Sequence, residues 1–264
     1  MSEVRQYVHR PAGPLRRYVR EILWISSDQP RVQTLLPETT LTLALRQSGS
    51  VSWRDEALPY SIVSGLQETA RVVEHGASSS FVVIRFTEVG APAILHEPAD
   101  QLYNQTSPLD SLLPRSDIDR IQNALSDTRD IHLQALRIER FLLDRIRPQT
   151  RISRQIEAAV DVIRRSRGRS SVSAIARYIA MSQSALERHF RAAVGTTPKQ
   201  LSRLARLHHV CALWQSGKPL TEIAFAAGYT DQPHLVRDFR LFTGTSPEKF
   251  FRSSSPQNLP TFYK

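Results

Sequence analysis

The chain has 264 residues, of which 41% are hydrophobic and 23% are charged, and its formal net charge at pH 7 is +10. This length fits about two domains, and the apolar share is enough for ordinary hydrophobic cores. Cys211 is the only cysteine, which excludes a disulfide framework and a zinc site built on cysteines and fits a reducing cytoplasm. No apolar run approaches the roughly 18 residues of a membrane helix, and the N-terminus lacks the apolar core of a signal peptide.

The net positive charge is confined to the C-terminal part of the chain. Residues 151–264 hold 18 basic residues (lysine or arginine) against 7 acidic ones, whereas residues 1–150 hold 17 basic residues against 18 acidic ones. A basic domain beside a neutral one is typical of a protein that binds a polyanion. The alternative is a solvated basic face without a partner, and the repeat described below argues against it.

Residues 1–110 are predicted to form mostly β-strands. Between Thr40 and Leu45, leucine occupies every second position, which is the period expected of a strand with one buried face. A turn at Gln47–Ser50 follows, and the next short strands are predicted at Val51–Trp53, Ser61–Val63, Ala70–Glu74 and Ser80–Phe86. Such a series indicates a small sandwich or barrel. The segment Leu15–Trp24 fits either a short helix or an edge strand.

The chain carries no recognisable catalytic motif. GxSxG, P-loop and HExxH patterns are all absent from the sequence. Among residues of metal-ligating type, His75, His96 and Glu97 lack an HxH spacing, so we predict no metal site, no cofactor and no enzyme activity. The large aromatic residues of this half are interpreted as core rather than as a ligand platform, and they are Trp24, Trp53, Tyr60 and Phe86. Periodicity does not identify the residues of an effector pocket.

Two helices are predicted after Pro114, at Ser116–Leu125 and Ile131–Arg147. The second is apolar over so much of its circumference that it needs two packing partners. One would be the barrel, and the other is either a second subunit or the rest of the same chain. The residues concerned are Ile131, Leu133, Ala135, Leu136, Ile138, Phe141, Leu142, Leu143 and Ile146.

A break at Pro148–Thr150 then marks a domain boundary. The predicted domains are therefore residues 1–148, which are β-rich and end in the two helices, and residues 152–253, with a frayed tail at 254–264. The C-terminal domain begins with a helix that carries Ile152, Ile156, Ala159, Val160 and Ile163.

One motif occurs twice in the C-terminal part. Leu186-x-Arg188-x-Phe190-Arg191 returns as Leu235-x-Arg237-x-Phe239-Arg240, and Gly195-Thr-Thr-Pro198 returns as Gly244-Thr-Ser-Pro247. The offset is 49 residues after the turn and 48 before it, so the second copy has one extra residue in the turn. Self-similarity at a fixed offset indicates two copies of one supersecondary unit.

Each copy has the pattern of a helix-turn-helix. The first copy has a supporting helix at Val172–Ile179 and a presented helix at Gln183–Val194, with Ser182 as its cap and Gly195 as its stop. The second copy has a supporting helix at Leu220–Ala227, a turn at Gly228, and a presented helix from Asp231 or Gln232 to Thr243. A long helix from Pro198 to Gln215 joins the two copies.

With these motifs the chain resembles the AraC/XylS family of bacterial transcription regulators. The resemblance covers about 100 residues, from Ile152 to Arg252, and the second copy carries its most specific signature. The matching residues are Ile223-Ala224, Gly228-Tyr229, Asp231-Gln232, His234-Leu235, Arg237, Phe239-Arg240, Gly244, Ser246-Pro247 and Phe251-Arg252. Pro233 departs from the family, which has a small polar residue there, and removes a possible polar base contact.

The resemblance implies an α+β chain with a cupin-like N-terminal barrel that binds an effector or forms a dimer, followed by an all-α domain of two helix-turn-helix units. It implies a cytoplasmic, sequence-specific DNA-binding regulator that acts as an activator, with double-stranded DNA, RNA polymerase and a second copy of the chain as partners. One alternative is a non-sensing DNA-binding protein whose N-terminal domain only dimerises. Another is a DNA-modifying enzyme. Such an enzyme needs a reactive cysteine outside the DNA-binding domain, whereas Cys211 lies inside that domain.

The joining helix spans about 27 Å at 1.5 Å per residue. It can therefore set the two presented helices about one DNA turn, roughly 34 Å, apart, so that they enter successive major grooves. Exposed positions near the start of a presented helix face base edges. The candidates are Gln183, Ser184, Glu187, Arg188 and Arg191 in the first copy, and Gln232, His234, Val236, Arg237 and Arg240 in the second.

An arginine side chain can donate hydrogen bonds to guanine, and a glutamine side chain can pair with adenine. A glutamate side chain can accept a hydrogen bond from cytosine. For each arginine the alternative is a phosphate contact or a free surface charge, and base contact is favoured more for Arg188 and Arg237 than for Arg191 and Arg240. The basic run Arg164–Arg169 is interpreted as solvated rather than as a phosphate contact. His208 and His209 lie beside Cys211, but adjacent residues do not share a helix face, so we predict no metal or redox switch there.

Overall fold

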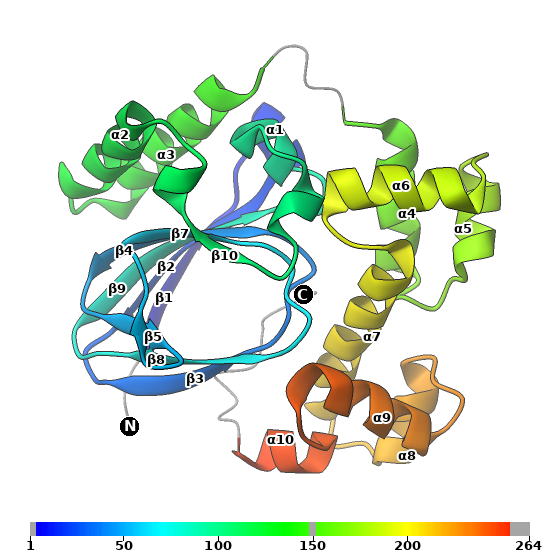
Figure 1. Ribbon diagram of the computed structural model, residues 1–264. Coiled ribbons are helices and arrows are strands. Elements are labelled where there is room, and N and C mark those ends of the chain that lie inside the picture. Colours follow the sequence, from blue (N-terminus) through cyan, green and yellow to red (C-terminus); the bar gives the residue numbers. More distant parts are fainter. Residues whose placement is uncertain (1–3, 148–151, 254–264) are drawn as a thin grey trace.

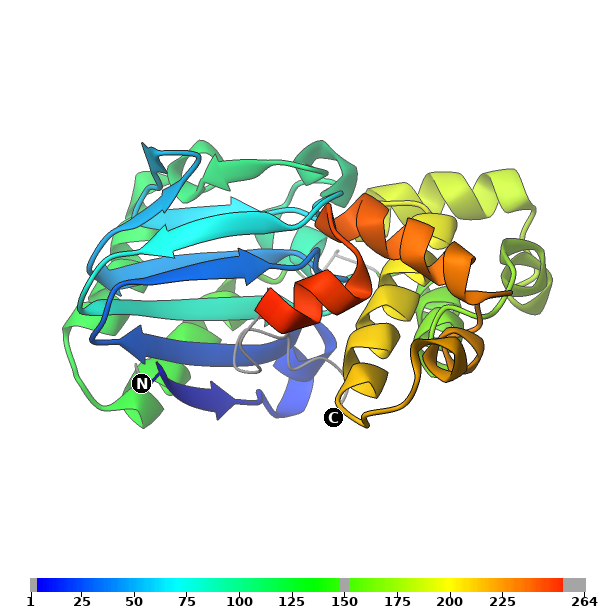
Figure 2. The same cartoon turned by 90° about the horizontal axis from the view of Figure 1, so that it is seen from below.

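The computed structural model describes residues 4–147 and 152–253. A β-rich part and a helical part lie side by side (Figures 1 and 2). The β-rich part has two antiparallel sheets around a cavity, and we call it the barrel. Its six-stranded sheet has the order β1-β2-β9-β4-β7-β10, and its four-stranded sheet has the order β3-β8-β5-β6. The strands are β1 Val4–His9, β2 Val19–Ser27, β3 Arg31–Leu35, β4 Thr42–Ser48, β5 Val51–Trp53, β6 Glu56–Ala57, β7 Ser61–Ser64, β8 Arg71–His75, β9 Ser79–Phe86 and β10 Thr106–Pro108.

The six-stranded sheet separates the main hydrophobic core from the cavity. Along β9, Val82 and Ile84 are buried in the main core, whereas Phe81, Val83 and Arg85 line the cavity. The alternation follows from the strand period of two. The cavity-facing residues can therefore differ in polarity without changing the packing of the main core.

Helices cover the other face of this sheet. They are the short α1 (Ala91–Leu95), α2 (Arg115–Ser126) and α3 (Ile131–Arg145). A buried polar contact joins α3 to β2, because Trp24 Nε1 donates to Gln134 Oε1 at 2.6 Å. The Gln134 amide donates in turn to the carbonyls of Leu125 and Thr128, so α3 is fixed both to the sheet and to the end of α2. Three 3₁₀ segments complete this part: Gly13–Arg17 (η1), Ala99–Leu102 (η2) and Leu109–Ser111 (η3).

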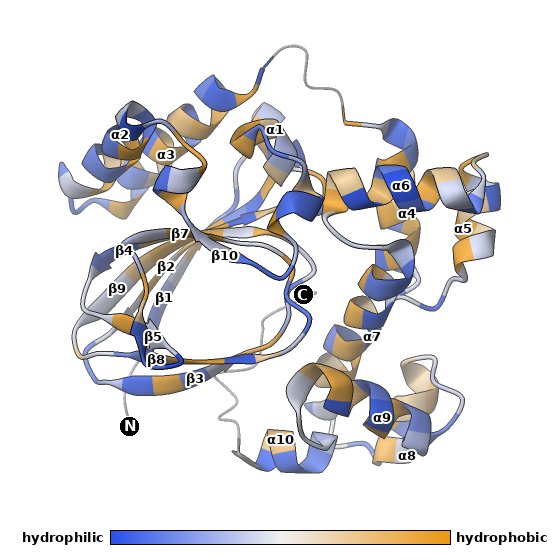
Figure 3. Cartoon of the chain, viewed as in Figure 1, coloured by the Kyte–Doolittle hydropathy of each residue, from blue (hydrophilic) through white to orange (hydrophobic). Residues whose placement is uncertain are grey.

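The C-terminal part is entirely helical within the described residues. Its helices are α4 Arg154–Arg165, α5 Val172–Tyr178, α6 Gln183–Val194, α7 Pro198–Trp214, α8 Leu220–Ala226, α9 Gln232–Thr243 and α10 Pro247–Ser253. Ser182 caps α6 and Asp231 caps α9, each through its side chain. In Figure 3 apolar and polar segments alternate along α6 and α9, as expected of helices that bury one face.

The predicted fold class is confirmed, and most predicted helices and strands lie within a few residues of the observed ones. The segment Leu15–Trp24 is the main correction. It is neither a helix nor an edge strand: a 3₁₀ turn leads into β2, which lies between β1 and β9. Helix α3 ends at Arg145 rather than Arg147 because Ile146 adopts an extended backbone. The predicted break at Pro148–Thr150 and tail at 254–264 fall outside the described residues.

The aromatic residues of the barrel divide into two groups. Trp24 and Phe86 are buried in the main core, as predicted. Tyr60 is 62% exposed and borders the cavity, where Arg46 lies over its ring, so the core interpretation was wrong for Tyr60. Trp53 is half-buried and packs against a small apolar cluster of Val51, Val73 and Phe81. Among the described residues, none of the helices combines the length and apolarity needed to cross a membrane.

Candidate DNA-binding surface and effector cavity

The first presented helix, α6, buries one face and exposes the predicted contact residues. Leu186 and Phe190 are fully buried. Among the candidates, Gln183, Ser184, Arg188 and Arg191 are exposed, and Glu187 is half-buried. The C-terminal end of α6 lies against the barrel, because a Cβ atom added at Gly195 would come within 2.8 Å of the Ala99 carbonyl oxygen. The start of α6 is therefore the end that remains open to a large ligand.

The second presented helix, α9, exposes fewer of its candidates. Arg237 and Arg240 are exposed, whereas Gln232, His234 and Val236 are half-buried. The His234 ring stands edge-on to Tyr229 at 5.2 Å, and Val236 packs against the core. On α9 the two arginines are thus the candidates most available to DNA.

A buried ionic cluster attaches α9 to the joining helix α7. Asp238 accepts from Arg203 Nε and Nη2 at 2.8 and 2.5 Å, and its other oxygen accepts from the Tyr229 hydroxyl at 3.0 Å. Burial, followed by the nearby Asp238 carboxylate, raises the pKa of Tyr229. The sequence analysis missed Asp238 and Arg203. The available signal was an acidic residue in the middle of a helix that otherwise presents basic residues.

The turns of the two units follow the predicted pattern. Ala180 and Gly228 adopt left-handed conformations at φ 53° and 83°. The residues that follow them, Met181 and Tyr229, donate backbone hydrogen bonds to Ala176 and Ala224 respectively. The second unit then has the extra residue Thr230 before the helix cap.

Residues 175–253 match the profile of a family described as "Helix-turn-helix domain". The match falls on the two units and α7, together with α10, and it identifies this part of the chain as a helix-turn-helix domain of AraC type. No curated protein sequence matches the chain.

Several solved structures are similar to this chain at low identity. ToxT from Vibrio cholerae is 11% identical with a TM-score of 0.45, and the match covers 95% of this chain and 98% of that chain. The C-terminal domain of AraT, a response regulator from Geobacillus stearothermophilus, is 21% identical with a TM-score of 0.38, and the match covers 44% and 95%. An AraC-type regulator from Chromobacterium violaceum is 24% identical with a TM-score of 0.32, and the match covers 39% and 88%.

The helical part contacts the barrel through two loops, a buried one at Pro37 and a half-buried one at Ala70. His208 Nε2 of α7 donates to the Pro37 carbonyl at 2.7 Å, and the Ala70 backbone N–H donates to the Phe242 carbonyl of α9 at 2.6 Å. At the edge of the interface, Arg17 forms a two-point ion pair with Glu157 of α4 at 2.8 Å for each contact. Since the apolar core is continuous across the interface, the two parts are held as one body.

The histidines and the cysteine of α7 do not form a common site. His208 faces the barrel, whereas His209 contacts Arg167 at 3.1 Å. Burial lowers the pKa of both histidines to about 4, and burial raises the pKa of the Cys211 thiol to about 12. All three side chains are buried within the fold.

The basic run Arg164–Arg169 comprises the last two residues of α4 and the tight turn that follows, which packs on α7. Arg206 donates to the Gly168 carbonyl at 2.9 Å, and Arg164 pairs with Asp161 at 2.6 Å. A Cβ atom at Gly168 would lie 2.0 Å from the Ser202 carbonyl oxygen. Within the run Arg164, Arg165, Arg167 and Arg169 are all exposed.

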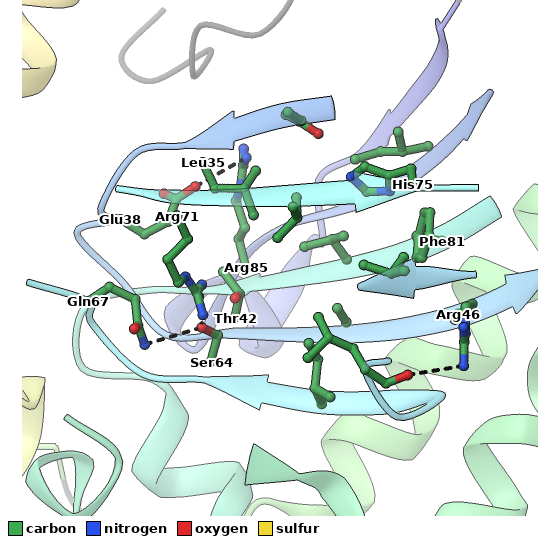
Figure 4. Close-up of a pocket in the computed structure, with 18 of the residues that line it drawn as sticks. Leu35, Glu38, Thr42, Arg46, Ser64, Gln67, Arg71, His75, Phe81 and Arg85 are labelled. Atoms are coloured by element: carbon green, nitrogen blue, oxygen red, sulfur yellow. Dashed lines mark hydrogen bonds and ion pairs between the residues drawn. The ribbon is translucent and has the colours of Figure 1, made fainter. Parts of the chain in front are cut away.

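The barrel encloses a cavity of about 200 Å³, and its lining falls into three layers. The first layer, the polar end, lies beside the two loops that contact the helical part (Figure 4). The middle layer is mostly aliphatic, with Ala44, Ile62, Val73 and Val83 beside Gln33. The third layer, the cationic end, contains Arg31, Arg46, His75 and Phe81. The polar end consists of Glu38, Thr42, Ser64, Gln67, Arg71 and Arg85.

Opposite charges balance one another at the polar end. Arg85 contacts Glu21 at 2.7 Å and Glu38 at 3.5 Å. Arg71 donates to the hydroxyls of Ser64 and Thr106 at 2.8 and 2.5 Å. Burial raises the pKa of Glu38 and lowers the pKa of Arg71 to about 10. This end therefore balances its charges within the chain, and Glu38 Oε2 is its buried acceptor without a hydrogen-bond partner among the described residues.

The cationic end has no acidic residue in its lining. Arg31 has no hydrogen-bond partner among the described residues, and its Nε atom is buried. Both ring nitrogens of His75 are also buried without a partner, and its ring stands edge-on to Phe81 at 5.2 Å. Burial, followed by the Arg31 charge, lowers the pKa of His75 to about 4. The sequence analysis named His75 only as a residue of metal-ligating type and did not place it in a cavity.

The residues of metal-ligating type that the sequence analysis named do not lie together in the structure. His75 lies in the cavity, whereas His96 follows α1 and contacts the Arg145 carbonyl at 2.8 Å. No group of three or more such side chains lies close enough to hold a metal ion within residues 4–147 and 152–253.

Proposed function

We propose that the protein is a sequence-specific transcription regulator whose DNA binding is controlled by a small molecule in the barrel cavity. Residues 1–148 would form the effector domain and residues 152–253 the DNA-binding domain. The observation that carries the proposal is an adjacency along the chain. Glu38 and Arg71 line the polar end of the cavity, and their immediate neighbours, Pro37 and Ala70, make hydrogen bonds to the DNA-binding domain.

This adjacency gives the effector a short route to the DNA-binding helices. A ligand that displaces Glu38 moves the Pro37 carbonyl, which holds α7, and a ligand that displaces Arg71 moves the Ala70 amide, which holds α9. Coupling of this kind is reciprocal, so DNA binding must change the stability of the same two loops.

Hydrogen exchange tests the coupling without a known effector. We expect the exchange rate of the Ala70 amide to change when the full chain binds its DNA site, while the amide of Val83, in the centre of the six-stranded sheet, stays unchanged. Identical exchange at Ala70 in free and DNA-bound protein would contradict the coupling. The DNA site comes from in vitro selection with the full chain, and failure to enrich any sequence would contradict sequence-specific binding itself.

We further propose that the candidates on α6 and α9 contact DNA in successive major grooves. They are Gln183, Ser184, Glu187, Arg188 and Arg191 on α6, and Gln232, His234, Val236, Arg237 and Arg240 on α9. Arg188 and Arg237 are the proposed guanine readers, because both are exposed, both occupy the same position in the repeat, and both lie nearer the start of their helix than Arg191 and Arg240. The half-buried His234 and Val236 are proposed to support α9 and to touch the groove only at their edges.

We propose that the protein acts as a homodimer through α3. Leu133, Leu136 and Leu143 are 39%, 62% and 39% exposed on this helix, and three exposed leucines at helical spacing need a partner surface. Sedimentation of Leu136→Lys is expected to show monomer at concentrations where the wild type is dimeric. Leu241→Lys, at an equally exposed leucine on α9, serves as the control. A monomeric wild type would contradict the proposal that the protein dimerises through α3.

As a regulator of AraC type, the protein is further proposed to act in the bacterial cytoplasm as an activator that contacts RNA polymerase. In vitro transcription from a promoter that carries the selected site tests this. Activation is expected to require the full chain, and repression from the same template would reverse the assignment.

A further inference from the structure

The cavity has a size that limits its ligand. Its volume of about 200 Å³ compares with about 150 Å³ for an engineered protein cavity that holds benzene. The lining between the two ends is mostly aliphatic, with Val73 on the four-stranded sheet and Val83 on the six-stranded sheet. The space therefore fits an apolar body of about one ring, with a short extension.

The charge of the lining is strongly unequal. Four arginines line the cavity, and Glu38 is its only acidic residue. Glu38 lies at the polar end, where it contacts Arg85. At the other end, Arg31 and Arg46 have no carboxylate beside them in the lining, and no ion pair joins either arginine to an acid among the described residues.

Buried polar atoms without a hydrogen-bond partner occur at both ends of the cavity, but at the cationic end, where no acid lines the cavity, they belong to Arg31, Arg46 and His75. Arg31 and His75 are directly opposite each other on β3 and β8, so their side chains point to the same side of the sheet. Neither Arg31 Nε nor either nitrogen of His75 has a partner. Because buried polar groups in folded proteins are normally hydrogen-bonded, this cluster points to an acceptor that comes from outside the chain.

Arg46 differs from Arg31 in its bonding. Its Nη1 and Nη2 atoms donate to the carbonyls of Gly49 and Leu58 at 3.3 and 3.2 Å, and its guanidinium lies 4.1 Å from the centre of the Tyr60 ring. Arg46 is therefore held in place and adds positive potential, whereas Arg31 is free to contact a ligand directly. Figure 4 shows Arg46, His75 and Phe81 at one end of the cavity and Glu38, Arg71 and Gln67 at the other.

We propose that the effector is a small organic carboxylate with an aromatic or branched apolar body, bound with its carboxylate against Arg31 and His75. The apolar body lies between Phe81, Val73 and Val83, and its far end reaches the polar layer, where Ser64 and Gln67 can bond a hydroxyl substituent. The inference rests on the proposed effector control and names the ligand class for it. A ligand that satisfies Arg31 stabilises the folded chain by mass action.

Matched ligand pairs test the inference on the wild-type full chain. Calorimetry and thermal unfolding would compare benzoate, phenylacetate and 4-methylpentanoate with their neutral amides. We expect each carboxylate to bind at least tenfold more tightly than its amide, because a charge-assisted hydrogen bond is lost in the amide. Equal binding of acid and amide overturns the proposal. Hexadecanoate, a long-chain carboxylate, tests the size limit. If it binds more tightly than phenylacetate, the conclusion that the cavity holds an apolar body of about one ring is overturned.

Two variants that each replace an arginine with glutamine test where the ligand carboxylate binds. Arg31→Gln removes a side chain without a hydrogen-bond partner in the fold, so we expect unchanged unfolding and about tenfold weaker carboxylate binding. Arg16→Gln makes the same change at an exposed position of η1 and should leave binding unchanged. Carboxylate binding that survives Arg31→Gln overturns the site.

The outcomes separate this inference from the proposed function. Binding of a neutral ligand in the cavity, with no carboxylate bound, refutes the ligand class and leaves effector control standing. Carboxylate binding that does not change affinity for the selected DNA confirms the site and refutes effector control. Failure of DNA selection concerns only the DNA-binding proposal.

Discussion

The two helix-turn-helix units share one motif and differ in how they are attached to the rest of the molecule. In both units a leucine and a phenylalanine are buried at equivalent positions, Leu186 and Phe190 in the first, Leu235 and Phe239 in the second. The equivalent of the buried Asp238 is His189, which is exposed on α6. The repeated residues therefore form the core of each unit, and the residues that are not repeated determine how each unit is attached to the rest of the molecule.

The attachment differs accordingly. The second unit is bonded to α7 by the Arg203–Asp238 pair, which also engages Tyr229. The first unit lies with Gly195 against Ala99 of the barrel. The barrel therefore contacts α6 at Gly195 and α9 at Phe242, and α9 is in addition bonded to α7.

The largest expected effect comes from Asp238→Ala. Removing the carboxylate leaves Arg203 without its charge partner at a buried site, and we expect a loss of about 3 kcal/mol in the free energy of unfolding. The change His189→Ala, at the equivalent position of the first unit, should cost less than about 0.5 kcal/mol. Urea unfolding of both variants measures the difference, and equal losses would remove the distinction between the units.

The second comparison concerns base reading. Arg188→Ala and Arg237→Ala are each expected to cost about 1–3 kcal/mol in affinity for the selected site and to relax preference at one base pair. Arg191→Ala and Arg240→Ala should weaken binding to all sequences alike, as expected of phosphate contacts. Binding assays on single-base variants of the site distinguish the two patterns. Uniform weakening for Arg188→Ala would show that it holds phosphate only.

The third comparison is between buried and exposed histidines. His208 has its pKa lowered to about 4 by burial, so between about pH 6.5 and pH 4 the unfolded chain binds more protons than the folded one. Its contribution to stability is present above about pH 6.5 and is lost as the pH falls. We expect this to cost about 1–2 kcal/mol at pH 5.

The variant His208→Gln, which keeps a donor for the Pro37 carbonyl, should reduce the stability difference between pH 7 and pH 5. The change His189→Gln, at an exposed histidine of α6, should leave that difference unchanged. Urea unfolding at the two pH values measures it, and an unchanged pH dependence in His208→Gln would assign the effect to other groups.

The smallest expected effects come from the two turns. Gly228→Ala places a Cβ in a left-handed conformation at φ 83° and 2.6 Å from Arg169 Cγ, and we expect a loss of about 1–2 kcal/mol. Ala180→Gly relieves the same conformation at φ 53° and should stabilise the first unit by about 0.5 kcal/mol. Thermal unfolding checks both signs, and a destabilised Ala180→Gly would show that the chain-entropy cost of glycine dominates.

Helix bounds were the most predictable feature, because they depend on local signals. The cap Ser182 and the stop Gly195 delimit α6 at the predicted residues. Among the segments without such signals, β1, β2 and β3 were mispredicted or left unassigned. The alternation in β1 and β3 is weak, and β2 is apolar enough to fit a helix. Only pairing with β1 and β9 on its two sides identifies β2 as a central strand.

The sequence by itself determined the two helix-turn-helix units and the position of Arg188 and Arg237 on their exposed faces. Periodicity and caps act over a few residues, so they can be read along the chain. Only the tertiary structure decided that Arg31 meets His75, that Asp238 binds Arg203, and that Pro37 and Ala70 hold the DNA-binding domain. Each of these contacts joins separate elements, and strand register and helix docking are set by packing of the whole chain.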